Sequence, residues 1–153
     1  MAAMRFARPI TAILLLAGMT IPGVAPGLPE SVPGPVQARV LRVIDGDTIV
    51  VRARIWLGQN IDTQVRLDGV DTPELKGKCQ RERRLAVRAC DLILARSAGG
   101  MVILSEIHYG KYAGRVVARV WPPGGGDLST ALVEAGLGRA YEGGRRESWC
   151  SPP

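Results

Sequence analysis

Residues 40–56 read VLRVIDGDTIVVRARIW, two runs rich in β-branched residues on either side of a short acidic turn. In the second run every other residue from Ile49 to Ile55 is apolar, and the residues between them include two arginines. Alternation with a period of two is typical of a strand that turns one face inward. The stretch therefore predicts two antiparallel strands, at Val40–Ile44 and Ile49–Trp56, joined at a glycine-containing turn.

The chain beyond this hairpin predicts three more strands and two helices. The predicted elements are a short strand at Val65–Leu67, a helix from about Gln80 to Arg96, strands at Met101–Ile107 and Arg115–Trp121, and a helix that Asp127 can cap and Gly136 can end. Five strands with a helix between the third and the fourth is the order of an oligonucleotide-binding barrel. We therefore expect a mainly β fold of the α+β class, a five-stranded OB-fold Greek-key barrel with an inserted helix and a short second helix.

The N-terminal residues are expected to lie outside the folded domain. Arg5 and Arg8 precede an apolar run from Ile10 to Met19, so residues 1–25 predict a secretory signal peptide or, as an alternative, an uncleaved anchor. The run is shorter than the ~20 residues that cross a membrane, so no stable span is expected after processing. A Pro- and Gly-rich linker at residues 26–37 then leads to one domain at residues 38–150. We expect an exported protein, either periplasmic or secreted.

The chain has 20 basic and 14 acidic residues, a formal net charge of +6, so its partners are expected to be anionic. Much of the positive charge lies in one cluster around the start of the predicted helix, formed by Lys76, Lys78, Arg81, Arg83, Arg84 and Arg88. Such a cluster fits a nucleic acid held through its phosphates, although a solvated helix face has the same pattern. We expect a monomer whose partner is DNA, RNA or both.

Three cysteines, Cys79, Cys90 and Cys150, allow at most one internal disulfide. If the helix begins at Gln80, Cys79 and Cys90 lie about 16 Å apart along it, whereas a disulfide needs Cα atoms within about 7 Å. Cys90 lies in an apolar stripe of the helix and fits a small buried residue. By elimination we expect a disulfide between Cys79 and Cys150. With His108 as the only histidine, the sequence does not support a zinc site.

Four acidic residues stand near predicted strand ends. Asp45 and Asp47 flank Gly46, which permits a tight turn, so both carboxylates project to one side of the chain. Asp71 and Glu74 follow in a loop that a proline stiffens. Four such carboxylates repel one another unless a cation lies among them, and a hard cation such as Ca²⁺ prefers oxygen ligands. For the first pair taken alone, an Asp-rich turn without a metal is the alternative.

Two arginines accompany these acids. Arg66 lies between the inward-facing Val65 and Leu67, so its side chain leaves the opposite face of that strand, and Arg115 follows Gly114 at the start of another strand. A guanidinium contacts two phosphate oxygens at once and stabilises the negative charge that develops on them during attack. Acids alone indicate a metal site and arginines alone a binding site. Their combination favours hydrolysis of a phosphodiester.

Four motifs occur in order along the chain: Val43–Thr48, Val65–Leu67, Val70–Glu74 and Gly114-Arg115. Together they resemble the staphylococcal nuclease (thermonuclease) family over about Ala38 to Tyr141. No single motif is decisive, but four in register are specific. The resemblance implies a Ca²⁺-dependent enzyme that cleaves DNA and RNA endonucleolytically.

The resemblance also implies a role for each acid and arginine. Asp47 and Asp71 correspond to direct Ca²⁺ ligands, and the backbone carbonyl of Thr72 completes the set that the protein provides. Asp45 corresponds to a carboxylate close to the metal that does not bind it directly. Glu74 corresponds to the residue that activates the attacking water. The two arginines, Arg66 and Arg115, correspond to the pair that binds the phosphate and stabilises the pentacoordinate transition state.

The turn before Arg115 departs from the family pattern. The family commonly has an acid and a tyrosine there, whereas this chain reads KYAGR at residues 111–115. Lys111 and Tyr112 are therefore the candidate substrate-binding residues of this turn, and Tyr112 can contact phosphate or sugar after a small backbone shift. Further along, Tyr141 can stack on a base or fill the end of the core.

The predicted function is an exported Ca²⁺-dependent nuclease that hydrolyses phosphodiester bonds by metal- and arginine-assisted attack of water. The alternative is a non-catalytic OB-type module that binds nucleic acid without cutting it, because the same fold serves both purposes. A pure binder gains nothing from Asp47, Asp71 and Glu74 beside a polyanion, which favours the enzyme.

Overall fold

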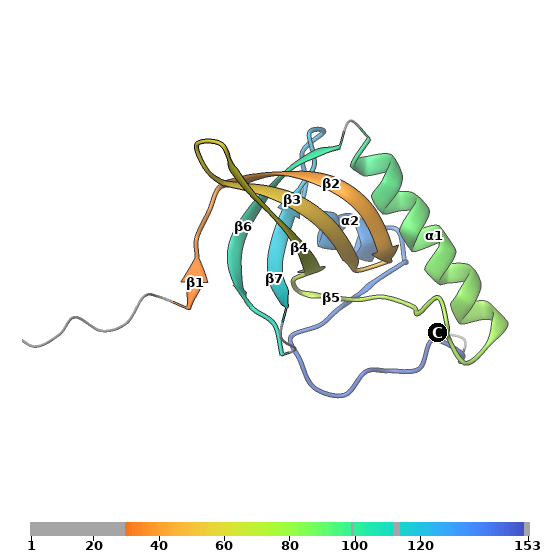
Figure 1. Cartoon of the computed structure of the whole chain (residues 1–153). Coiled ribbons are helices and arrows are strands. Elements are labelled where there is room, and N and C mark those ends of the chain that lie inside the picture. The colour runs from red at the N-terminus through yellow and green to blue at the C-terminus, as the bar shows by residue number, and fades with distance from the viewer. Residues whose placement is uncertain (1–29, 99, 112–113, 152–153) are drawn as a thin grey trace, which may run out of the picture.

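The computed structural model describes residues 30–98, 100–111 and 114–151. In this part of the chain five strands close into a barrel (Figure 1): β2 (Val36–Asp45), β3 (Thr48–Trp56), β4 (Gln59–Leu67), β6 (Met101–Tyr109) and β7 (Arg115–Trp121). The pairing of β6 with β7 closes the barrel, and β4 and β7 are its parallel pair. The predicted fold class, a five-stranded barrel of the α+β class, is confirmed.

Two helices and three short strands complete the described part. They are α1 (Gln80–Arg96), α2 (Leu128–Glu134), β1 (Ser31–Val32), β5 (Val70–Asp71) and β8 (Arg139–Ala140). The helix α1 lies along the outside of the barrel beside β2 (Figure 1). Its N-cap is Cys79, whose sulfur accepts a hydrogen bond from the Glu82 backbone N–H. The two strands β5 and β8 form a separate small sheet beside the barrel.

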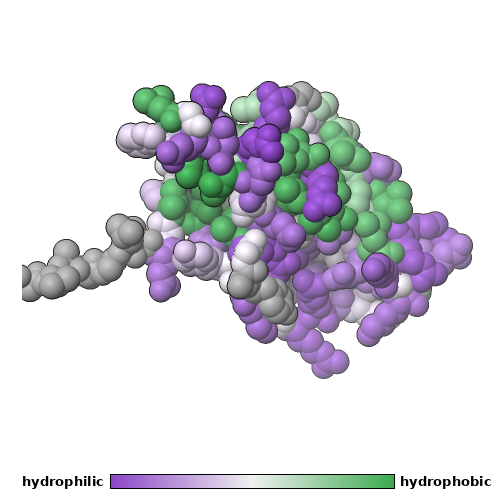
Figure 2. Space-filling model, viewed as in Figure 1, coloured by the Kyte–Doolittle hydropathy of each residue, from purple (hydrophilic) through white to green (hydrophobic). Residues whose placement is uncertain are grey.

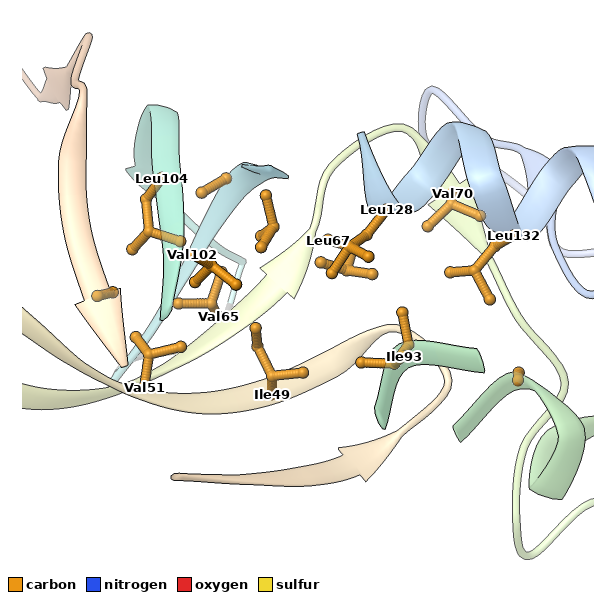
Figure 3. Packing of buried hydrophobic residues seen from close by; sticks show 14 of the residues in the cluster. Ile49, Val51, Val65, Leu67, Val70, Ile93, Val102, Leu104, Leu128 and Leu132 are labelled. Carbon is orange, nitrogen blue, oxygen red and sulfur yellow. The ribbon is translucent and has the colours of Figure 1, made fainter. Parts of the chain in front are cut away.

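The hydrophobic core fills the barrel and continues between the barrel and both helices (Figure 3). Ile49, Val51 and Val65 point into the barrel from β3 and β4, while Ile93 of α1 and Leu132 of α2 extend the core outward. Each of these side chains is fully buried, and burial of one such side chain stabilises the fold by about 1.5–3 kcal/mol. Packing therefore fixes both helices against the barrel end that carries the candidate site.

The strand β4 is longer than the sequence indicated. Only Val65–Leu67 was predicted, whereas β4 begins at Gln59 and pairs with β3 along its whole length. The first half of β4 is mostly polar and exposed, so it has no apolar alternation for a pattern to detect. The pairing itself stabilises it, helped by a two-pronged contact from Arg52 to Asp62 with N···O distances of 2.7 and 2.8 Å.

The N-terminal boundary of the fold also lies earlier than predicted. Ser31 and Val32 pair with β6, β2 begins at Val36, and the Pro33 carbonyl accepts a hydrogen bond from the Glu106 N–H at 2.9 Å. Ser31, Val32 and the residues from Val36 onward therefore belong to the sheet, because β6 supplies pairing that a proline-rich composition does not reveal. The predicted signal peptide lies outside the described residues. Among the helices of residues 30–151 that the structure describes, none has the length and apolar character to cross a membrane.

Candidate active site

The turn between β2 and β3 carries two of the predicted acids. Asp45 and Thr48 face each other across the strand pair, and Gly46 and Asp47 form the turn between them. The Asp47 backbone N–H donates to Asp45 Oδ1 at 3.2 Å, and the Thr48 hydroxyl donates to Asp47 Oδ1 at 2.9 Å. Asp47 is only 4% exposed. The local hydrogen bonds thus hold a buried carboxylate at the end of the barrel.

Gly46 is required by close packing. A Cβ at this position would lie 2.7 Å from the Ala89 Cβ on α1 and 3.0 Å from the Thr72 Oγ1. The sequence suggested a glycine needed for the turn conformation, but Gly46 does not have a positive φ. The inserted helix therefore presses directly on the acidic turn and positions it.

We expect Gly46→Ala to lower the free energy of unfolding by about 1–3 kcal/mol, the usual cost of overpacking. The added methyl group must displace either α1 or the loop at Thr72. Gly124→Ala is the matched control, because a Cβ there meets nothing within 4 Å, and it should change stability by less than about 0.5 kcal/mol. Urea unfolding followed by circular dichroism measures both variants. Equal stability of Gly46→Ala and the parent would show that the turn is not tightly packed.

Arg66 binds the acidic turn directly. It stands opposite Thr48 on the neighbouring strand, and its Nη1 lies 2.7 Å from Asp47 Oδ1, with both side chains nearly buried. Its Nη2 donates to the Val70 carbonyl at 3.2 Å. A guanidinium has five N–H donors, so others remain for a phosphate. Arg66 thus connects the acidic turn to β5 and keeps anion-binding capacity.

The strand β5 brings the second group of predicted residues to the same end of the barrel. Asp71 ends β5, and Asp71 and Thr72 are each 3% exposed. Glu74 follows in the loop, and its side chain is 56% exposed. The Leu67 N–H at the end of β4 donates to the Asp47 carbonyl at 2.8 Å, which holds the chain leading to β5 against the acidic turn. A Cβ on Gly46 would lie 3.0 Å from the Thr72 Oγ1, and the charge of Asp47 acts on Asp71, so Asp47, Asp71 and Thr72 lie at the same end of the barrel.

Two residues of the C-terminal tail, residues 141–151, contact the acids of the site, although no sequence motif indicated them. Arg146 bridges two acids: its Nε lies 3.0 Å from Asp71 Oδ1, and its Nη1 lies 2.6 Å from Glu74 Oε1. The Trp149 indole N–H donates to Asp71 Oδ2 at 3.2 Å. One Asp71 oxygen thus accepts a hydrogen bond from Trp149, while the other forms an ion pair with Arg146 and accepts no hydrogen bond within the described residues.

The disulfide explains how the tail reaches the site. Cys79 and Cys150 form the predicted bridge, with Cα atoms 5.8 Å apart, and Cys90 is the unpaired cysteine of the described residues. The bridge ties the end of the tail to the start of α1, close to the loop that follows β5. The pairing of Cys79 with Cys150 is also the feature of the sequence from which the position of Arg146 and Trp149 near the acids could have been predicted.

Burial raises the pKa of two acids in the site. Burial raises the pKa of Asp45 to about 6, and the negative charge of Asp47 adds to this effect. Burial also raises the pKa of Asp71, while the Trp149 hydrogen bond and the charge of Arg146 oppose the rise. Carboxylates whose negative charge is disfavoured in this way are stabilised by a cation among them. The electrostatics therefore favour binding of positive charge.

Arg115 lies on the same face of the barrel wall as Arg66. It pairs with Gln64 in the parallel register of β7 and β4, two residues before the partner of Arg66. Side chains two residues apart on a strand point to the same face, so the two predicted phosphate-binding arginines share a surface.

The predicted substrate-binding residues are less closely associated with the acids. Lys111 is exposed in the turn after β6. Tyr112 lies outside the described residues. The Tyr141 backbone N–H donates to the Gly69 carbonyl at 3.0 Å, and its hydroxyl donates to the Gly144 carbonyl at 2.9 Å. These two contacts give Tyr141 an anchoring role at the start of the tail.

The oxygen donors of the site fit a hard divalent cation. Asp47 and Asp71 offer buried carboxylates and Thr72 a carbonyl, which are the ligand types that a hard cation such as Ca²⁺ prefers. The group of three ligand-type side chains that lies within 4.8 Å in the described residues is a different one, Cys79, Glu82 and Cys150. Its two sulfurs form the disulfide, so it is not a metal site.

A family model described as Staphylococcal nuclease homologue matches residues 64–149, more than half of the chain. The chain belongs to this family. It is also 30% identical over 107 residues to an "Uncharacterized endonuclease" of Escherichia coli and, to the same degree, to one of Escherichia coli O157:H7. The alignment covers 70% of this chain and 62% of each relative, so the chain spans less than two thirds of their length. The family resemblance inferred from the four motifs is confirmed.

The matched region of this staphylococcal nuclease homologue contains the β5 loop, Arg66, Arg115 and most of the tail. It begins at Gln64, just before Arg66, and ends at Trp149, while the acidic turn precedes it. The unpredicted tail residues therefore lie within the family's domain and do not belong to an added segment.

Proposed function

We propose that this staphylococcal nuclease homologue is an exported, Ca²⁺-dependent nuclease that hydrolyses phosphodiester bonds of DNA, RNA or both. One observation carries the proposal: the Arg66 guanidinium lies 2.7 Å from the buried Asp47 carboxylate, and the charges of both groups act on Asp71. A cation-binding group and an anion-binding group thus share one end of the barrel. Hydrolysis of a phosphodiester uses both, because negative charge develops on the phosphate as water attacks.

In this proposal Asp47, Asp71 and the Thr72 carbonyl hold the metal. Asp45 accepts the Asp47 backbone N–H and keeps the turn in shape. When bound, Ca²⁺ supplies positive charge that neutralises the phosphate and lowers the free energy of the transition state. The protein contributes a buried, preformed set of oxygen donors.

The arginines and Glu74 act on the phosphate and on water. Arg66 and Arg115 share one face of β4 and β7, where two guanidinium groups can bind the non-bridging oxygens. Glu74 is the most exposed of the acids in the site, so water reaches its carboxylate. It orients the attacking water and accepts its proton.

The surroundings of the acids suit a polyanion. A cavity of about 600 Å³ adjoins Asp71 and Glu74, and its walls include Lys76, Lys78 and Arg146. Phosphates along a nucleic-acid strand can bind these side chains and release counterions. Export is part of the proposal because the N-terminal apolar run precedes a domain closed by a disulfide, and disulfides persist in oxidising compartments.

The full chain is expected to degrade single-stranded DNA or RNA when Ca²⁺ is added and to stop when a chelator removes it. Asp71→Asn should abolish cleavage at moderate Ca²⁺ concentrations, because an amide is a weaker ligand than a carboxylate. Asp91→Asn, an equal charge change on the exposed face of α1, should cleave like the parent. Release of acid-soluble nucleotides measures the rate.

Two outcomes contradict the proposal in different ways. Cleavage that continues in the chelator removes the metal assignment. Nucleic acid bound by the parent, but never cut at any Ca²⁺ concentration, makes the protein a binding module of the same fold.

A further inference from the structure

The C-terminal tail, residues 141–151, crosses the end of the barrel that carries the acids. It leaves β8, passes below the barrel and ends beside the start of α1 (Figure 1). Hydrophilic residues gather along this lower edge of the molecule (Figure 2). The tail thus lies over the candidate active site, with Arg146 near its middle.

Contacts on both sides of Arg146 fix the tail. Before it, the Tyr141 backbone is bonded to Gly69. After it, the Trp149 side chain is 8% exposed, and the Arg139 guanidinium lies 3.9 Å from the centre of its ring. The disulfide follows immediately, and the Arg81 guanidinium donates to the Ser151 carbonyl at 2.7 Å. The backbone that carries Arg146 is therefore held independently of the Arg146 side chain.

Glu74 depends on Arg146 for its orientation. Within the described residues, the hydrogen bond to Arg146 at 2.6 Å is the one that the Glu74 carboxylate makes. Glu74 stands on a loop with its side chain 56% exposed, where several side-chain conformations are open to it. A group that accepts a proton from water must be held within hydrogen-bond reach of that water.

We propose that Arg146 is a positioning residue that holds Glu74 for attack by water, and that the Cys79–Cys150 disulfide holds Arg146 over the site. This inference rests on the proposed function and assigns a further task within it. The planar guanidinium reaches Asp71 through Nε and Glu74 through Nη1, so it sets the distance between the metal-binding acid and the acid that activates water. A lysine keeps the charge but has no rigid fork to bridge both acids.

The ion pair contributes little to the stability of the fold. Arg146 and Glu74 are 43% and 56% exposed, and pairs with that exposure are screened by solvent. Removal of the Arg146 side chain should therefore leave the melting temperature nearly unchanged. An effect on catalysis can then be separated from an effect on folding.

Arg146→Gln is expected to lower kcat on single-stranded DNA by about 10- to 100-fold, the range seen when a residue that orients a site ligand is lost. KM should change by less than about twofold. Arg54→Gln is the matched control, because the exposed Arg54 side chain on β3 makes no hydrogen bond or ion pair within the described residues and does not line the cavity beside Asp71 and Glu74. Arg146→Lys should recover part of the lost rate. Steady-state kinetics of the full chain at saturating Ca²⁺ measure all four proteins.

Calcium binding without substrate, measured by titration calorimetry, gives a second readout. Loss of the positive charge beside Asp71 should leave the Ca²⁺ dissociation constant unchanged or lower it, because a nearby cation competes with the metal. A disordered tail would instead weaken Ca²⁺ binding and lower the melting temperature.

The outcomes separate this inference from the proposed function. An inactive parent overturns the proposed function. An active parent with equal kcat in Arg146→Gln and Arg54→Gln overturns the inference alone. A fall in kcat together with weaker Ca²⁺ binding and a lower melting temperature also overturns it, because Arg146 then acts through general structure.

Discussion

Glu74→Gln is expected to lower kcat on single-stranded DNA by about 100- to 10,000-fold, the contribution of a positioned general base. Glutamine has nearly the same size, and its amide oxygen can still accept the hydrogen bond from Arg146. It cannot take up the proton that leaves the attacking water. KM should change by no more than a few-fold, because Glu74 binds no phosphate in the proposed mechanism. Single-turnover and steady-state rates at saturating Ca²⁺ give both quantities.

Glu134→Gln at the end of α2 is the control for the loss of one negative charge, because Glu134 is exposed and lies outside the site. It should have the kcat of the parent. A parental rate in Glu74→Gln would assign water activation to another group. A raised KM with unchanged kcat would instead make Glu74 a substrate-binding residue.

The double replacement Cys79→Ser/Cys150→Ser is expected to lower the free energy of unfolding by about 2–5 kcal/mol. The two cysteines are 71 residues apart, so the open chain gains much conformational freedom in the unfolded state. Serine at position 79 can still cap α1, because its hydroxyl accepts a backbone N–H as the cysteine sulfur does. The loss should therefore reflect the bridge and not the helix start. Urea unfolding of the variant and of the parent with and without reductant measures it.

Cys90→Ser is the control for this variant, because Cys90 is not in the disulfide. It should lower stability much less, and reduction should bring the parent close to the double variant. A double variant as stable as the parent would show that the tail is held by Trp149 and its neighbours alone.

The disulfide and Arg146 should also be coupled in their effect on rate. In the double-serine protein the tail is expected to release Arg146, so kcat falls even where the protein remains folded. Adding Arg146→Gln to that protein should then lower kcat by a smaller factor than the same replacement does in the parent. If Arg146→Gln lowers kcat by the same factor with and without the disulfide, the disulfide does not act through Arg146.

Periodic segments were predictable with little error. The helix α1 and the strand β7 have the bounds that the sequence indicated, Gln80–Arg96 and Arg115–Trp121. In α1 the residues at helical spacing, such as Ala89 and Ile93, are fully buried. The short strands β1, β5 and β8 were missed, because two residues are too few to have a period. Their pairing partners lie far away in the sequence.

The candidate site was predictable in its residue types and only partly in its geometry. Family motifs pointed to Asp47, Asp71, Glu74 and the arginine pair, and the structure places Asp47, Asp71 and Arg66 at one end of the barrel. The role of each residue remains a proposal. No motif pointed to Arg146, because a single arginine in a polar tail has no pattern around it.

The sequence alone indicates the order of the main strands and helices, the acidic turn and the cysteine pairing. They depend on apolar spacing and on local residue types, which are visible in a short window of sequence. Folding alone decided that α1 packs on Gly46 and that Arg146 meets Glu74, 72 positions away. Such contacts form because the closed barrel and the disulfide bring distant segments together. Local periodicity does not indicate which distant segments will be neighbours in space.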